Sequence, residues 1–184
     1  MAAAVVTSKD APRAFFVLLV VLVLQLTVAL DIRVGGAHPD LILGLAVAAG
    51  LAGGTERGAI IGFFSGLALD LFLPTPFGLS ALVGIVVGVA AGQLLAAGVD
   101  RTTWFFVPGV AALGSAIGVI MFAVLGAVLG QPDTLTVGLG AAVGVVAVVN
   151  GALGFAMVRA CNWAFGLDTA GSAWRGPLVP GGRP

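Results

Sequence analysis

A single carboxylate, Asp70, lies three residues before the end of a strongly apolar segment, on a helix face that also carries glycines. The glycines precede it at four-residue intervals and are Gly58, Gly62 and Gly66. This spacing places them with Asp70 along one side of a helix, and an acid in such a segment is expected to have a partner. We expect that partner to be Gln25, Arg33, the amides of the turn at residues 74–76, or another protein.

Catalytic chemistry has little support elsewhere in the chain. The sequence contains no P-loop, no paired His and Glu metal motif and no G-x-S-x-G elbow. Cys161 is the only cysteine and His38 the only histidine, which excludes an intrachain disulfide and a Cys/His metal cluster. The other outer acids, Asp31, Asp40 and Asp133, are expected in loops. We therefore predict a protein that is not an enzyme and uses no metal and no cofactor.

The composition indicates that lipid surrounds most of the chain. Of 184 residues, 60% are hydrophobic and 9% are charged, against roughly 45–50% and 25% in soluble domains. Mean hydropathy is +1.18. The formal net charge is +0, so no broad basic surface is available to bind nucleic acid.

The apolar segments predict an all-α polytopic membrane protein, a compact bundle of about six transmembrane helices. The predicted spans are residues 14–30, 41–54, 58–73, 77–97, 104–129 and 135–158. A span needs about 20 helical residues, so the second and third are short. They are expected to cross the membrane separately, although one re-entrant hairpin, leaving four spans, is the alternative.

Basic residues predict the orientation of the bundle. With both termini in the cytoplasm, every Lys and Arg except Arg33 lies on the cytoplasmic side, as the positive-inside rule requires. Residues 1–13 then form a cytoplasmic segment, residues 14–158 the helix bundle, and residues 159–184 a cytoplasmic tail too poor in apolar residues to fold.

Polar and small side chains should hold these helices together. Gln93 and Asn150 are expected near the cytoplasmic side, where they could hydrogen-bond each other. Glycines recur at four-residue spacing in other segments, as Gly84, Gly88 and Gly92, Gly114 and Gly118, Gly126 and Gly130, and Gly140 and Gly144. Such spacings permit close helix packing, within the chain or with a partner, and predict a tight bundle with little room for a cavity.

Residues 62–82, GFFSGLALDLFLPTPFGLSAL, with Pro39, Asp40 and Leu41 before them, resemble the bacterial rod-shape-determining membrane protein MreD family. In that family a glycine-containing third helix carries an acid at the place of Asp70, and a Gly-Leu-x-Ala-Leu-like sequence opens the next helix. The resemblance covers residues 13–158.

The resemblance implies a non-catalytic subunit of the cell-elongation machinery in the bacterial plasma membrane. It implies binding to the bitopic protein MreC and regulation of cell shape and lateral peptidoglycan synthesis, with indirect action on the MreB actin homologue and peptidoglycan synthases. Our hypothesis is that MreC binds a surface formed by Gly62, Gly66, Asp70, Pro74, Pro76 and Gly78. The alternative function is a substrate-binding membrane subunit of an energy-coupling-factor vitamin transporter, and a structural subunit of another membrane complex is a third possibility.

Overall fold

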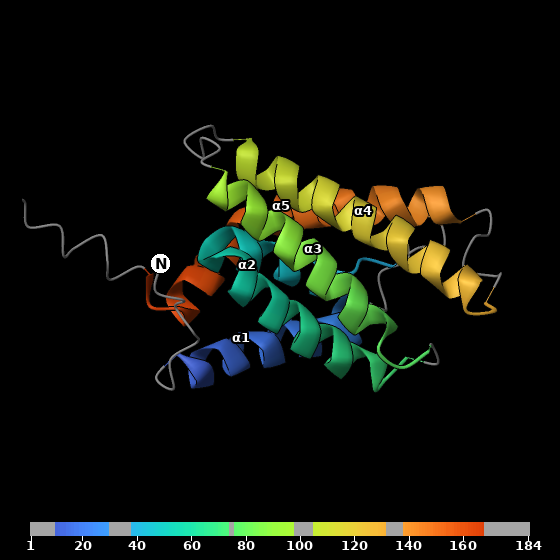
Figure 1. Ribbon diagram of the computed structural model, residues 1–184, viewed down its shortest axis with the longest axis horizontal. Helices are drawn as coiled ribbons and strands as arrows, with labels where there is room; N and C mark the ends of the chain where they lie inside the picture. Colours follow the sequence, from blue (N-terminus) through green and yellow to red (C-terminus); the bar gives the residue numbers. More distant parts are fainter. Residues whose placement is uncertain (1–9, 30–37, 74–75, 98–104, 132–137, 168–184) are drawn as a thin grey trace, which may run out of the picture.

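The computed structural model describes residues 10–29, 38–73, 76–97, 105–131 and 138–167. These residues form a helical bundle without strands (Figure 1). The α-helices are α1 (Ala11–Leu24), α2 (Leu41–Asp70), α3 (Leu79–Ala96), α4 (Phe106–Val128) and α5 (Leu139–Ala164), and the π-helical segment η1 (Gln25–Ala29) continues α1. The predicted all-α class is confirmed for this part of the chain.

The prediction of six separate spans is corrected by the helix lengths. The described residues form five α-helices, because the predicted second and third spans belong to one element, α2. Within the described part of the chain, α4 and α5 alone are, by length and composition, long and apolar enough to cross a membrane. Shorter apolar helices cover Ala11–Thr27 and Leu79–Leu94.

Helix α2 reverses direction at Gly54. This residue has φ 85° and ψ −176° inside the element, a conformation essentially restricted to glycine. A methyl group on Gly58 would lie 2.8 Å from the Cα of Gly50, whereas eight residues of straight helix would separate the two by about 12 Å. Residues 41–53 and 55–70 are therefore two antiparallel half-helices, and the predicted break between the second and third spans lies at this bend.

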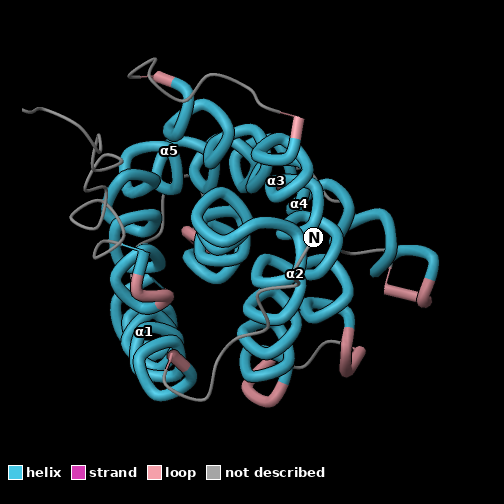
Figure 2. The backbone as a smooth tube through the Cα atoms, turned by 60° about the vertical axis from the view of Figure 1, so that its left-hand side comes forward, coloured by secondary structure: helices cyan, strands magenta, loops and turns pink. Residues whose placement is uncertain are grey.

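The first half-helix forms the centre of the molecule. All residues from Leu41 to Ala52 are buried, and α2 contacts each of α1, α3, α4 and α5. Figure 2 shows these helices arranged around it. A helix apolar on all sides has to be enclosed, and this one is enclosed by protein.

Glycines of the second half-helix interlock with glycines of α3. A methyl group on Gly62 would meet the backbone of Gly84, and one on Gly58 would meet the backbone of Gly88, both well inside contact distance. These two glycine ladders thus bring backbones together, as small residues do between helices in membranes. In contrast, a methyl group added to Gly140 or Gly144 would meet nothing within 4 Å.

The start of α1 and the end of α5 lie together at one end of the bundle. The guanidinium of Arg13 lies 5.5 Å from the centre of the Trp163 ring, and that of Arg57 lies 4.7 Å from the Phe165 ring. Helix α5 extends to Ala164, beyond the predicted limit at residue 158, because Cys161 and Ala164 are buried in the core. The predicted disordered tail is therefore helical at its beginning, and residues 168–184 lie outside the described residues.

Candidate functional site

Asp70 caps the helix that follows it. The side chain is 4% exposed, and its oxygens accept hydrogen bonds from the backbone N–H groups of Gly78 at 2.9 Å, Ser80 at 3.2 Å and Ala81 at 3.4 Å. Gly78 has φ 91°, which turns the chain so that these amides converge. The partner of Asp70 is therefore the N-terminus of α3, where free amides and the helix dipole favour a carboxylate.

The other partners expected for Asp70 can now be compared with this arrangement. Gln25 bonds elsewhere, as described below, and Arg33 lies outside the described residues. Residues 74 and 75 of the expected turn also lie outside the described residues, and the bonds that the structure describes go to Gly78, Ser80 and Ala81, just beyond that turn.

The predicted partner-binding face is already occupied by this chain. Gly62 and Gly66 are buried, and a methyl group on Gly66 would meet the backbone of Ser80. Pro76 is partly buried beside the turn, whereas Pro74 lies outside the described residues. A partner helix could reach Gly62, Gly66 and Asp70 only by displacing α3, so the structure leaves no open groove there.

A second capped helix start lies deeper in the bundle, at Asp40. Its Oδ1 accepts hydrogen bonds from the N–H groups of Ile42 at 3.0 Å and Leu43 at 3.2 Å. The N–H of Leu41 donates to Oε1 of Gln25 at 2.7 Å, and Nε2 of Gln25 donates to the Pro39 carbonyl at 3.1 Å. Gln25 begins η1, so the π-helical segment supplies the side chain that completes this cap.

Asn150 and Ser115 join the same network. Nδ2 of Asn150 donates to the Asp40 carbonyl at 2.7 Å and to Oγ of Ser115 at 2.9 Å, and both side chains are fully buried. Asn150 lies about 16 Å along α5 from the start of that helix. The expected bond between Asn150 and Gln93 is therefore wrong, because Gln93 is exposed on α3 while Asn150 faces the start of α2.

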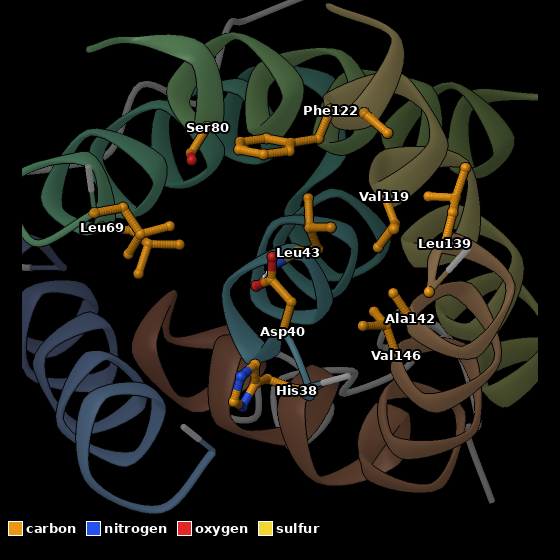
Figure 3. A pocket seen from close by; sticks show the side chains of 13 residues that line it. His38, Asp40, Leu43, Leu69, Ser80, Val119, Phe122, Leu139, Ala142 and Val146 are labelled. Atoms are coloured by element: carbon orange, nitrogen blue, oxygen red, sulfur yellow. Dashed lines mark hydrogen bonds between the residues drawn. The ribbon is translucent and has the colours of Figure 1, made fainter. Parts of the chain in front are cut away.

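A cavity of about 380 Å³ lies above Asp40. Figure 3 shows its walls and the first half-helix of α2 at its floor. The lining is His38, Asp40, Leu43, Leu69, Leu73, Ser80, Val119, Phe122, Ala123, Gly138, Leu139, Ala142 and Val146. The expectation of a bundle with little room for a cavity is wrong. The first half-helix of α2 begins inside the bundle, beside Asn150 and Ser115, and not level with the end of α4 and the start of α5.

The polar groups of this cavity gather on its floor and one wall. Asp40 Oδ2 accepts no hydrogen bond from any described residue, since both bonds go to Oδ1. Nδ1 of His38 is buried and also lacks a hydrogen-bond partner within the described part of the chain. Asp40 is partly buried, and a carboxylate forms strong hydrogen bonds with a cation or a donor that reaches it, so the cavity can bind a group of that kind.

Sequence reasoning missed this site because it placed Asp40 in an outer loop. One available signal was the position of Asp40 immediately before an apolar run, which is typical of an N-cap. Ser115 and Asn150 gave no comparable signal, because their contact joins residues far apart in the chain.

A second hollow, of about 500 Å³, is a groove between α1 and the second half of α2. It is lined by Ala11, Ala14, Phe15, Leu18, Ile60, Ile61, Phe64, Leu67, Ala68 and Leu71. Phe15 is 63% exposed and Phe64 is 54% exposed. This groove, unlike the Asp70 face, is open along two helices.

Comparisons with known proteins identify no relative. No family model, no curated protein and no solved structure matches the chain.

Proposed function

We propose that the chain is a multi-pass protein of the bacterial plasma membrane with both termini in the cytoplasm. The bend at Gly54 supports this, because it turns α2 into two antiparallel half-helices. The distribution of charge also supports it: Arg13 and Arg57 lie at the end that holds the close of α5, whereas Asp40 and Asp70 cap helices that start toward the opposite end. Basic residues gathered at one end are typical of the cytoplasmic side.

Within that membrane, the proposed function is a non-catalytic subunit of the cell-elongation machinery that binds an MreC-like bitopic protein. Such a subunit would help regulate cell shape and lateral peptidoglycan synthesis, and would act indirectly on an MreB-like actin homologue and on peptidoglycan synthases. The choice of this machinery rests on the sequence resemblance to the MreD family.

The observation that carries partner binding is the open groove between α1 and residues 55–70. Its lining is apolar throughout, with small residues such as Ala11 and Ala68 beside large ones such as Phe64. The stretch from Ile60 to Leu71 is about 16 Å long, so it can pack several turns of a single apolar helix. Association of helices in lipid depends on such packing and not on exclusion of water. We therefore move the proposed contact with MreC from the Asp70 face to this groove.

The test is co-purification with the MreC-like protein of the same cell after removal of the two exposed aromatic side chains of the groove. Phe15→Ala and Phe64→Ala are each expected to weaken the complex about fivefold or more, since truncating a central anchor typically costs at least about 1 kcal/mol. Cells carrying both changes should lose their rod shape.

The matched control is Phe155→Ala, which removes an aromatic side chain that is 51% exposed on α5, outside the groove. It should leave co-purification and cell shape unchanged. Equal co-purification of all three variants at normal expression would overturn the groove as the contact site.

A second candidate function, the vitamin-binding subunit of an energy-coupling-factor transporter, is favoured by the cavity above Asp40. Binding of a vitamin there would stabilise the folded protein against heat. A thermal-shift screen of the purified protein against vitamins tests it, and a saturable shift with one vitamin would favour transport over the elongation function.

A further inference from the structure

The geometry points to the cavity above Asp40 as a binding site for an organic ammonium group on a small apolar body. This inference goes beyond the proposed partner binding, because the cavity and the groove between α1 and α2 are lined by different residues. It concerns the chemistry of the ligand, and it holds whether the chain is a subunit of the elongation machinery or of a vitamin transporter.

The first step is the charge at the floor. Asp40 holds the start of α2 with one carboxylate oxygen, and leaves Oδ2 without a donor from the described residues. Figure 3 shows this carboxylate directed into the space below Ser80 and Phe122. A cationic donor forms stronger hydrogen bonds with a carboxylate than a neutral donor does, so an ammonium group is the better match for Oδ2.

The second step is that no described arginine competes for this carboxylate. Of the described basic side chains, Arg13 and Arg57 lie against the aromatic rings near the end of α5, and Arg159 is exposed on α5. None of them lines the cavity. Among the described residues, the negative charge of Asp40 is therefore met by the amides of its own helix and by no arginine, and His38 is the other ionisable side chain of the lining.

The third step is the shape and polarity of the walls. Leu43, Leu69, Val119 and Val146 surround the polar floor, and the Phe122 ring completes the wall. An aromatic ring also attracts a cation placed over its face. A volume of about 380 Å³ is in the range of small-molecule sites, so the apolar part of the ligand can be about the size of a fused bicyclic ring.

The test compares tryptamine with tryptophol, in which a hydroxyl replaces the ammonium group. Calorimetric titration of the purified full-length protein in detergent should give at least tenfold tighter binding of tryptamine. Asp40→Asn should abolish this preference, because asparagine is an equally good N-cap but carries no charge. Glu56→Gln, which removes a carboxylate at the other end of the bundle, is the matched control and should leave the preference unchanged.

A second variant acts on the volume of the cavity. Ala142→Phe fills space at the wall and should weaken tryptamine and tryptophol alike. The proposal is overturned if the unmodified protein binds tryptophol as tightly as tryptamine, if it binds neither at millimolar concentration, or if Asp40→Asn keeps the preference. The comparison of the two ligands needs only the unmodified protein, so it remains decisive when a variant does not fold.

The ammonium group can come from a free amine or from a lipid headgroup, and reconstitution distinguishes the two. In nanodiscs of phosphatidylglycerol alone, tryptamine should bind as it does in detergent. If added phosphatidylethanolamine weakens tryptamine binding tenfold or more, the headgroup is the occupant, and if it does not, the ligand is a free amine. Loss of co-purification with MreC has no bearing on either result, so failure of this inference and failure of the proposed function are separate outcomes.

Discussion

Asp40, which is partly buried, and Asp70, which is buried, both cap the start of a helix. The first amides of a helix have no partner within the helix, and both acids supply oxygens to them. Asp40 caps the helix that follows directly in sequence, whereas Asp70 ends one helix and caps the next across a turn. A position that appeared suited to bind a partner thus proves to fix a connection within the chain.

Replacing Asp70 with alanine should destabilise the protein. The change removes the acceptors of three buried or partly buried amides, and loss of a cap costs about 0.5–2 kcal/mol. Asp70→Asn, which retains one acceptor oxygen, should lie between alanine and the unmodified protein. Unfolding in mixed detergent and SDS measures the order.

Glu56→Ala is the control for Asp70, because Glu56 is exposed at the bend of α2. Its effect should stay within about 0.5 kcal/mol. Equal stability of Asp70→Ala and Glu56→Ala would contradict the capping role.

At the scale of elements, the packing of α2 on α3 depends on backbone contact at glycines. A Cβ at Gly62 would lie closer to the carbonyl of Gly84 than real Cβ atoms come to any atom. The neighbouring atom is backbone and not a flexible side chain, so the helices must move apart to relieve the contact. This gives the glycine ladder a specific structural role.

Gly62→Ala should therefore cost about 1–3 kcal/mol of stability, the usual range for overpacking. Gly144→Ala is a matched control, since it makes the same change in an exposed helical position where a Cβ would meet nothing within 4 Å. The control should be neutral or stabilising by up to about 1 kcal/mol, as expected from helix propensity. Similar destabilisation by both changes would show that packing of α3 on Gly62 is not the cause.

The bend of α2 gives a second prediction at this scale. Gly54→Ala should destabilise the protein by about 1–3 kcal/mol, although a Cβ there would meet nothing within 4 Å, because φ 85° is strained for alanine. Thermal unfolding of the purified protein measures it. An unchanged midpoint would mean that the chain reverses without this backbone conformation.

At the scale of the whole molecule, the described helix ends divide into two groups. The beginning of α1, the bend of α2 and the close of α5 lie at one end, joined by the contacts of Arg13 with Trp163 and of Arg57 with Phe165. The capped starts of α2 and α3 face the other way. A membrane placed across the bundle would therefore separate the bend at Gly54 from the turn at Gly78.

Cysteine labelling with a membrane-impermeant maleimide tests this placement. Glu56→Cys should react only from the cytoplasmic side, and Phe77→Cys, at a residue 66% exposed, only from the opposite side. The native Cys161 is buried and should give little background. A Glu56→Cys variant unreactive from both sides would instead support the re-entrant hairpin with four spans.

The amino-acid sequence by itself determined the helical class, the apolar segments and the break between the two halves of α2, because these follow from local composition and periodicity. It also indicated that Asp70 needs a partner and that glycine ladders allow close approach. It could not decide which helix fills each ladder, or that Gln25, Asp40, Ser115 and Asn150 meet around one helix start. Those contacts join residues distant in sequence, and their geometry depends on how far the central half-helix lies inside the bundle. Only the tertiary structure therefore determined that Gly62 faces α3 and that a cavity opens above Asp40.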